Sequence, residues 1–229
     1  IDGIDWMVED GKKAPFDFYF AVPSCVPATS LESSGAALTS SDIEGLLKRD
    51  EMVALGEMMD VPGVIAEDEE TLRKIEAAHK LGKPIDGHSP LLSGEDLEKY
   101  TSYGISTDHE CTSFEEAIEK SNLGMEIMVR EGSSAKDMDA LLNYDDRLNY
   151  LIEEEMAGRA VVETIDDAMG VSPFGLLVCD DIDAEDLSKG HLDRIIKKAI
   201  SLKINPKEAI KMATFNPAEH YGLKCGAIE

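Results

Sequence analysis

Short apolar runs alternate with longer amphipathic and charged stretches along the whole chain. Strands separated by helical stretches are typical of β/α units around a parallel sheet. The pattern therefore predicts an α/β fold with a parallel sheet. The six apolar runs that we expect to form strands are residues 16–22, 52–56, 84–88, 104–109, 125–130 and 174–180.

Two of the intervening stretches begin with the signal of a helix N-terminus. Ser41 with Glu44, and Ser113 with Glu116, have the Ser-x-x-Glu spacing of a capping box. Residues 68–81 place apolar side chains at helical spacing. These features predict helices after the first, second and fourth apolar runs.

The last part of the chain has the same character. Residues 192–202 have helical spacing, and Asn205-Pro206 and Asn216-Pro217 combine a capping residue with proline at the first helical position. We therefore expect three helices after the sixth strand.

The segment from Leu141 to Gly170 lies between the fifth and sixth predicted strands and is unusually long and acidic. It includes the run Glu153-Glu154-Glu155. We interpret it as an insertion that forms a helix or a pair of helices on the exterior.

Length and charge limit the class of protein. The chain has 229 residues, 43% of them hydrophobic, which fits one domain with a buried core and also allows two small ones. Its formal net charge of −25 repels phosphate backbones and anionic lipid. We therefore expect neither nucleic acid nor a membrane as partner.

The cysteines and the termini add little constraint. The four cysteines form no CxxC pair, so we expect reduced thiols and a cytoplasmic location. No apolar run reaches the roughly 18 residues that cross a membrane. Ile1 to Trp6 has neither a Met nor the basic region of a signal peptide, and we expect a piece of a longer chain at both ends.

Polar residues of the kind that bind metals occur where the apolar runs end. In a parallel sheet the carboxyl ends of the strands share one edge, so these side chains are expected to converge. Imidazole and carboxylate are ligands of Zn, Fe and Mn, and a nearby carboxylate can move a proton. The residues are Glu57, His88, His109, Glu110 and either Asp180 or Asp181.

Each of these residues alone is compatible with an ordinary surface or core position, and the recurrence at four strand ends carries the hypothesis. His79, His191 and His220 fall in or beside helical stretches and are interpreted as structural or exposed. The sequence contains no P-loop, GxGxxG, GxSxG or HExxH motif, which leaves nucleotide hydrolysis by a P-loop, Rossmann redox chemistry and serine hydrolysis without support.

Several segments together resemble the adenine deaminases. The resemblance covers nearly the whole chain apart from roughly residues 141–170, and its last segment is a closing motif of the wider amidohydrolase superfamily. The segments are residues 23–29 with 32–36, 55–64, 86–94, 104–112, 124–133, 179–181 and 213–223.

The resemblance implies a fold: an incomplete TIM-type (β/α)8 barrel in which residues 1–229 form part of the catalytic domain. The chain would hold about strands three to eight. The first-strand His-x-His pair and the small β-sandwich domain of the family are lacking, so the chain alone is expected to be inactive.

The resemblance also implies an activity: hydrolysis of adenine to hypoxanthine and ammonia in purine salvage, with two divalent ions (Mn, Fe or Zn). Asp180 would also be the proton shuttle, and Glu110 a second catalytic residue. The implied metal ligands are Glu57, His88, His109 and Asp180. The implied substrate-binding residues are Ser24, Cys25, Glu110 and Arg130.

Two other functions stay open from the sequence. One is hydrolysis of another cyclic amine or amide, because metal ligands alone do not select adenine. The other is a non-catalytic acidic module, if the first-strand histidines are truly absent. Self-association into a homo-oligomer is compatible with either.

Overall fold

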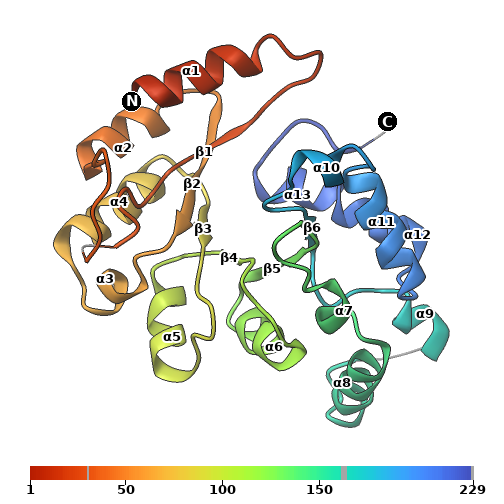
Figure 1. Ribbon diagram of the computed structural model, residues 1–229. Coiled ribbons are helices and arrows are strands. Elements are labelled where there is room, and N and C mark those ends of the chain that lie inside the picture. The colour runs from red at the N-terminus through yellow and green to blue at the C-terminus, as the bar shows by residue number, and fades with distance from the viewer. Residues whose placement is uncertain (30, 161–163, 228–229) are drawn as a thin grey trace. The chain divides into compact units, whose positions relative to one another are not determined.

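The computed structural model describes residues 1–29, 31–160 and 164–227, with residues 166–167 described by their backbone alone. Within these residues, six short parallel strands alternate with helices (Figure 1). The predicted α/β fold with parallel strands is confirmed. The numbering of the strands within an eight-stranded barrel stays a prediction.

All six predicted strands are present, although most are shorter than their apolar runs. The strands are β1 (Phe20–Val22), β2 (Met52–Met58), β3 (Ile85–Gly87), β4 (Thr107–Asp108), β5 (Glu126–Arg130) and β6 (Leu176–Val178). The helices before β4 are α1 (Asp2–Gly11), α2 (Ser40–Leu47), α3 (Val61–Ile65), α4 (Glu69–Lys80) and α5 (Gly94–Ser102). Those after β4 are α6 (Phe114–Asn122), α7 (Met138–Leu141), α8 (Tyr144–Met156), α9 (Ile165–Met169), α10 (Ala184–Leu187), α11 (Leu192–Ser201), α12 (Pro206–Met212) and α13 (Phe215–His220).

The chain divides into two compact units. The first comprises Ile1–Ser89 and Glu98–Ser106, and the second comprises Pro90–Leu97 and the chain from Thr107 onward. Each unit has its own three-stranded parallel sheet, in the order β1-β2-β3 and β4-β5-β6.

The first unit is built around β2, whose side chains are almost all buried. Helices α2 and α4 pack against each other and against this strand. Ile43 and Leu47 from α2 and Ile75 from α4 fill the interior with Leu55 of the strand. Burial of such side chains from the two layers stabilises the unit by about 1.5–3 kcal/mol for each large aliphatic residue.

Helix α1 and the start of strand β1 differ from the sequence prediction. Helix α1 was not predicted; it buries only Val8 among its residues, so it lacks the apolar stripe that marks a helix in a sequence. Strand β1 begins at Phe20 and not at Phe16, because Phe16 and Phe18 are exposed and pack against each other, with ring centroids 4.9 Å apart and the ring planes tilted by 48°.

The capping residue of α2 is a correction. Thr39, not Ser41, is the N-cap: its hydroxyl accepts a hydrogen bond from Asp42 N, and the Asp42 carboxylate accepts one from Thr39 N at 2.9 Å. Glu44 instead pairs with Lys48. The Thr-x-x-Asp box satisfies the backbone N–H groups of Thr39 and Asp42, as a Ser-x-x-Glu box would those of Ser41 and Glu44. The helix therefore begins about half a turn earlier than predicted.

The second unit has its sheet covered by α6, α11 and α12. Ser113 caps α6 as predicted, since its hydroxyl accepts a hydrogen bond from Glu116 N. Asn205 likewise caps α12, with Pro206 as the first helical residue. The local capping chemistry was therefore readable in the sequence at these two helices.

The predicted start of α13 is wrong. The helix begins at Phe215 with Thr214 in the capping position, so Asn216 lies inside it. The side-chain amide of Asn216 donates a hydrogen bond to Gly175 O at 2.8 Å. The asparagine thus bonds to the residue preceding β6 instead of capping its own helix.

The acidic segment 141–170 contains the helix pair that was predicted, α8 and α9; residues 161–163 of it lie outside the described residues. Arg147 of α8 is buried and donates to three backbone carbonyls, those of Leu142, Met169 and Leu202. It thereby ties the ends of three helices of the second unit together. Over the described part of the chain, no helix has both the length and the apolarity to cross a membrane.

Candidate functional site

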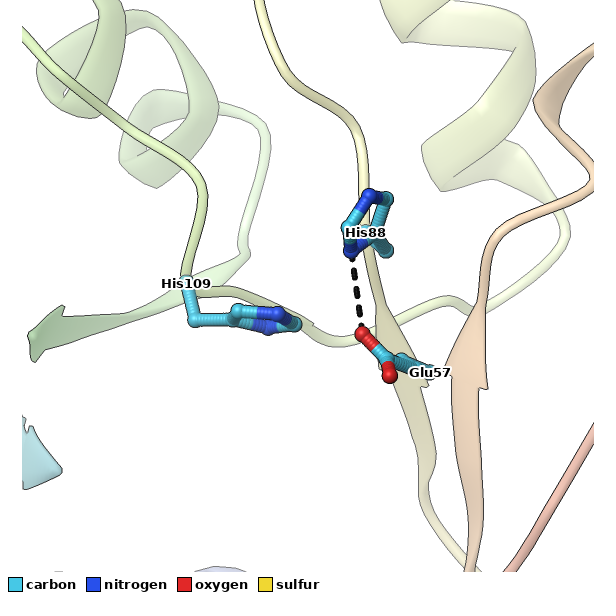
Figure 2. A group of neighbouring side chains, drawn as sticks. All are labelled: Glu57, His88 and His109. Carbon is cyan, nitrogen blue, oxygen red and sulfur yellow. Dashed lines mark hydrogen bonds and ion pairs between the residues drawn. The ribbon is translucent and has the colours of Figure 1, made fainter. Parts of the chain in front are cut away.

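Glu57 and His88 are neighbours at the ends of two adjacent strands of the first unit. Glu57 lies on β2 and His88 directly follows β3. The Nδ1 atom of His88 is 2.9 Å from an Oε2 oxygen of Glu57, as Figure 2 shows. Both side chains are partly exposed, so an ion or a small molecule can reach them.

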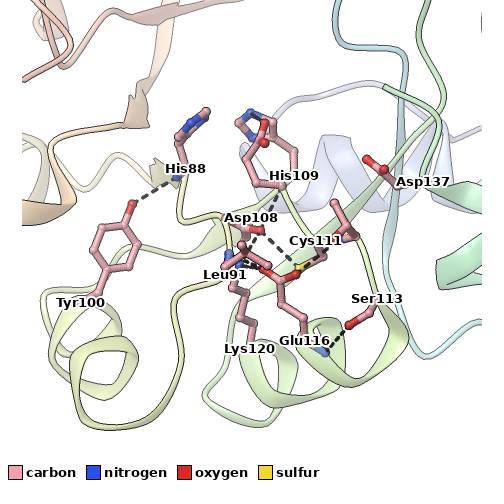
Figure 3. A network of polar contacts seen from close by, with 12 residues as sticks. His88, Leu91, Tyr100, Asp108, His109, Cys111, Ser113, Glu116, Lys120 and Asp137 are labelled. Carbon is pink, nitrogen blue, oxygen red and sulfur yellow. Dashed lines mark hydrogen bonds and ion pairs between the residues drawn. The ribbon is translucent and has the colours of Figure 1, made fainter. Parts of the chain in front are cut away.

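The backbone at these two strand ends is held by Tyr100, a fully buried residue of α5. Its hydroxyl donates to Met58 O at 2.7 Å. The same hydroxyl accepts from His88 N at 3.1 Å (Figure 3). One side chain therefore fixes the backbone beside both Glu57 and His88. Sequence reasoning missed it, because a tyrosine on an amphipathic helix is most simply a core residue.

Ser24 and Cys25 follow β1 and are both buried. The Ser24 hydroxyl donates to Glu57 O at 2.5 Å, and the Cys25 sulfur lies 3.6 Å from Met58 Sδ. These contacts support the end of β2. The predicted contact of Ser24 and Cys25 with substrate stays a prediction.

In the second unit, His109, Glu110 and Asp180 come together. His109 and Glu110 follow β4, and Asp180 follows β6. A nitrogen of His109 and one carboxylate oxygen each of Glu110 and Asp180 all lie within 4.8 Å of one another. The neighbouring Asp181 is not part of this group.

Asp180 has a left-handed backbone, with φ of 52°. Aspartate tolerates this conformation better than most residues, yet it remains uncommon outside glycine and is found at functional sites. The conformation turns the chain immediately after β6.

Arg130, the last residue of β5, connects the carboxylates of this region. Its guanidinium donates to Glu110 at 2.5 Å, to Asp180 at 3.0 Å and to Asp137 at 3.0 Å. Burial lowers the pKa of Arg130, but the interactions with Glu110, Asp137 and Asp180 together raise it by more, and the pKa lies above its ordinary value. The guanidinium is therefore a permanent positive charge among three carboxylates.

A buried ion cluster lies beneath His109 and Glu110. The ammonium of Lys120 is 3.0 Å from the Asp108 carboxylate and 2.7 Å from that of Glu116, and the lysine and Asp108 side chains have no exposed surface (Figure 3). Asp108 also accepts a hydrogen bond from Glu110 N at 3.0 Å. The cluster therefore supports the backbone that carries the two site residues.

Cys111 borders this cluster as a neutral thiol. Burial, and after it the Asp108 carboxylate, raise the pKa of the Cys111 thiol. Asp108, Cys111 and Glu116 have the spacing of a metal site. The Lys120 ammonium bridges the two carboxylates of this group, and the Cys111 thiol is held in the neutral form, which is not the form that binds a metal.

The loops after β5 and β6 are in close contact. A side chain at Gly132 would place its Cβ 2.2 Å from Cys179 O and 2.5 Å from Asp181 O, so only glycine fits. Next to it, Ser133 N donates to Asp181 O at 2.8 Å. This contact restrains the loop that carries Asp180.

The remaining histidines are structural or exposed, as predicted. His79 is exposed and its Nε2 lies 2.8 Å from Tyr103 O. His191 is exposed beside Cys179, and His220 packs edge-on against Tyr221.

Comparison with known proteins identifies relatives of the whole chain. A family model described as "Amidohydrolase family" matches residues 1–229. The chain is 47% identical over 228 residues to the adenine deaminase of Methanothermobacter thermautotrophicus, and 45% identical over 228 residues to that of Methanosphaera stadtmanae. Each alignment covers 100% of this chain and 37% of the relative.

More distant relatives agree. The adenine deaminase of Salinibacter ruber is 40% identical over 229 residues, which is 100% of this chain and 38% of the relative. The chain thus spans less than two fifths of the length of these curated relatives. Among solved structures, one of an uncharacterized protein has a TM-score of 0.45 and 14% identity, covering 83% of this chain and 50% of that one.

Proposed function

Since the chain belongs to the amidohydrolase family, we propose that the protein hydrolyses adenine to hypoxanthine and ammonia. The observation that carries the proposal is the group of His109, Glu110 and Asp180 at strand ends, in a chain 47% identical to an adenine deaminase. One water is consumed for each adenine, and the exocyclic amine leaves as ammonia.

Members of this family are metal-dependent, and the residues present fit a divalent cation. Around Arg130, the carboxylates of Glu110, Asp137 and Asp180 leave an excess of two negative charges over the single guanidinium. Imidazole and carboxylate oxygen together suit Mn, Fe and Zn. The proposed metal ligands are Glu57, His88, His109 and Asp180, for one or two ions.

The residues of the chain supply the other parts of the reaction. A bound divalent ion lowers the pKa of its water to about 7. The Asp180 carboxylate accepts a proton from the attacking water and delivers it to the departing amine. Glu110, which is 18% exposed, accepts a hydrogen bond from the purine ring or its amine.

The curated relatives favour adenine over another cyclic amine or amide. No feature of the residues that the structure describes favours a non-catalytic acidic module. A small-molecule substrate follows from the proposed reaction, while the cytoplasmic location and self-association stay predictions.

The test uses the protein expressed from its complete reading frame and loaded with Mn²⁺ or Fe²⁺. Adenine loss, hypoxanthine and ammonia are measured together with bound metal. Asp180→Asn is expected to lower kcat by at least about a hundredfold, because proton transfer by a positioned side chain contributes roughly 10²–10⁴. Glu57→Gln is expected to lower both the amount of bound metal and kcat, because it replaces the carboxylate of a proposed metal ligand with an amide. Glu44→Gln is the control, since that carboxylate is exposed and pairs with Lys48 at the surface.

A complete, folded protein that binds no divalent metal and leaves adenine unchanged would overturn the proposal. Metal binding without adenine turnover would support the proposed metal site and reject adenine as the substrate. Turnover that survives both substitutions would reject the assigned residues.

A further inference from the structure

The guanidinium of Arg130 is enclosed by carboxylates of the second unit. Its Nε donates to Asp137 at 3.0 Å, its Nη1 to Asp180 at 3.0 Å and to Glu110 at 2.5 Å, and its Nη2 to Glu110 at 3.4 Å. The side chain is only 8% exposed. All three guanidinium nitrogens thus face protein oxygens, and little surface remains for a substrate.

We propose that Arg130 is a positioning residue, which sets the orientation of the Asp180 and Glu110 carboxylates and does not bind substrate. Its planar fork fixes the directions of its donors, so the carboxylates that accept from it are held in direction as well as distance. The proposal rests on the proposed function, because it assigns Asp180 and Glu110 to the reaction.

Asp137 holds Arg130 in place. The Asp137 carboxylate accepts from the guanidinium, and Asp137 N donates to Arg130 O at 3.0 Å. Asp137 is thus hydrogen-bonded to both the main chain and the side chain of Arg130, which fixes the plane of the guanidinium. The Asp137 side chain is 14% exposed, so water does not readily replace this bond.

The Asp180 carboxylate needs a hydrogen-bond partner that fixes its orientation. Its side chain is 37% exposed and its backbone has the left-handed φ of 52°. Nothing in that loop conformation alone selects one rotamer of the carboxylate. The bond from Arg130 supplies the restraint from a buried strand end, which is more rigid than a loop.

The experiment compares Arg130→Lys and Asp137→Asn in the complete protein. Lysine keeps the charge but not the fork, so kcat for adenine should fall by about a hundredfold, the effect of a small misplacement of a reacting group. KM should stay within about threefold, because no substrate contact is removed. The double variant should be no slower than Arg130→Lys alone, since both act through one contact.

Lys198→Met is the matched control. That lysine also bridges two carboxylates of the second unit, Glu131 at 2.8 Å and Asp139 at 2.6 Å, and neither is one of the proposed catalytic residues. It should retain both kcat and KM.

A second readout does not depend on turnover. The visible d–d absorption of the Co²⁺-loaded protein reports the geometry of the ligand atoms, and it should change in Arg130→Lys and not in Lys198→Met. A raised KM with unchanged kcat would overturn the proposal in favour of substrate binding, and an unchanged Co²⁺ spectrum in Arg130→Lys would overturn it as well.

The two proposals fail in different ways. If the wild-type protein binds Co²⁺ and leaves adenine unchanged, the deaminase function is rejected and the Co²⁺ spectra still decide the role of Arg130. If Arg130→Lys does not fold, Asp137→Asn alone tests the role of Arg130. An unchanged kcat and an unchanged Co²⁺ spectrum in Asp137→Asn would reject the positioning role.

Discussion

Lys120 and Lys48 offer a direct comparison of a buried and an exposed ion pair. Each lysine pairs with a glutamate four residues earlier in a helix, at 2.7 Å for Lys120 with Glu116 and 2.8 Å for Lys48 with Glu44. The side chains of the first pair are 0% and 10% exposed, and those of the second 57% and 48%. Lys120 additionally neutralises the fully buried Asp108. Substitution by methionine keeps the length of the side chain and removes the charge.

We expect Lys120→Met to lower the free energy of unfolding by about 3–5 kcal/mol, because it leaves buried carboxylates without their cation. At about 2–4 °C per kcal/mol for a domain of this size, the melting temperature falls by about 6–20 °C. Lys48→Met should cost less than about 1 kcal/mol, since water screens the exposed pair.

The pH dependence has a definite sign. Burial lowers the pKa of Lys120, but its interactions with Asp108, Cys111 and Glu116 together raise it by more, so the folded-state pKa lies above that of the unfolded chain. The stabilisation is therefore complete below about pH 10, the range of an unfolded lysine, and is lost only as the pH rises through the higher folded value. The difference between wild type and Lys120→Met should be constant from about pH 6 to 9.

Urea unfolding of the complete protein, followed by circular dichroism, measures both variants. The reasoning is refuted if Lys120→Met costs no more than Lys48→Met. It is also refuted if the loss grows or shrinks steeply between neutral pH and about pH 9, because a lysine with a raised pKa, as Lys120 has, stays charged over that range.

Other consequences can be measured in the same protein. Tyr100→Phe removes the hydroxyl that accepts a hydrogen bond from His88 N, and it should lower the free energy of unfolding in urea by about 1–3 kcal/mol. It should also weaken Mn²⁺ binding measured by calorimetry. Unchanged stability and Mn²⁺ affinity would contradict this. Gly132→Ala would place a methyl group 2.5 Å from Asp181 O, so adenine turnover should fall as the loop after β6 is displaced, and full activity would speak against the tight contact. The Cys111 thiol, with its pKa raised by burial, should resist alkylation by iodoacetamide at pH 8 in the folded protein, as mass spectrometry of the digested protein would report.

Several elements could be predicted because their information is local. Each of the six apolar runs contains or overlaps a strand, and α4 and α11 follow from helical spacing. Period and capping are properties of consecutive residues, so a sequence carries them directly. Predictions failed where two local signals compete: at α2, Thr39 with Asp42 prevails over Ser41 with Glu44.

The sequence by itself determined which ligand-type residues follow strands, and hence that His109 and Asp180 would be candidates for one site. Their separation by a whole acidic segment does not matter, because parallel strands end on the same edge of a sheet. The sequence predicted Arg130 as a substrate-binding residue and did not reveal the carboxylates to which it is hydrogen-bonded. Arg130 meets Glu110, 20 residues before it, and Asp180, 50 residues after it.

Only the tertiary structure decided the partners of the buried charges. A buried arginine or lysine must find carboxylates with the right direction and distance, and those are supplied by whichever segments pack around it. The same holds for Tyr100, whose hydroxyl meets the ends of β2 and β3 only after α5 has packed. Sequence periodicity specifies which face of an element is buried, whereas the choice of one hydrogen-bond partner among several depends on three-dimensional packing.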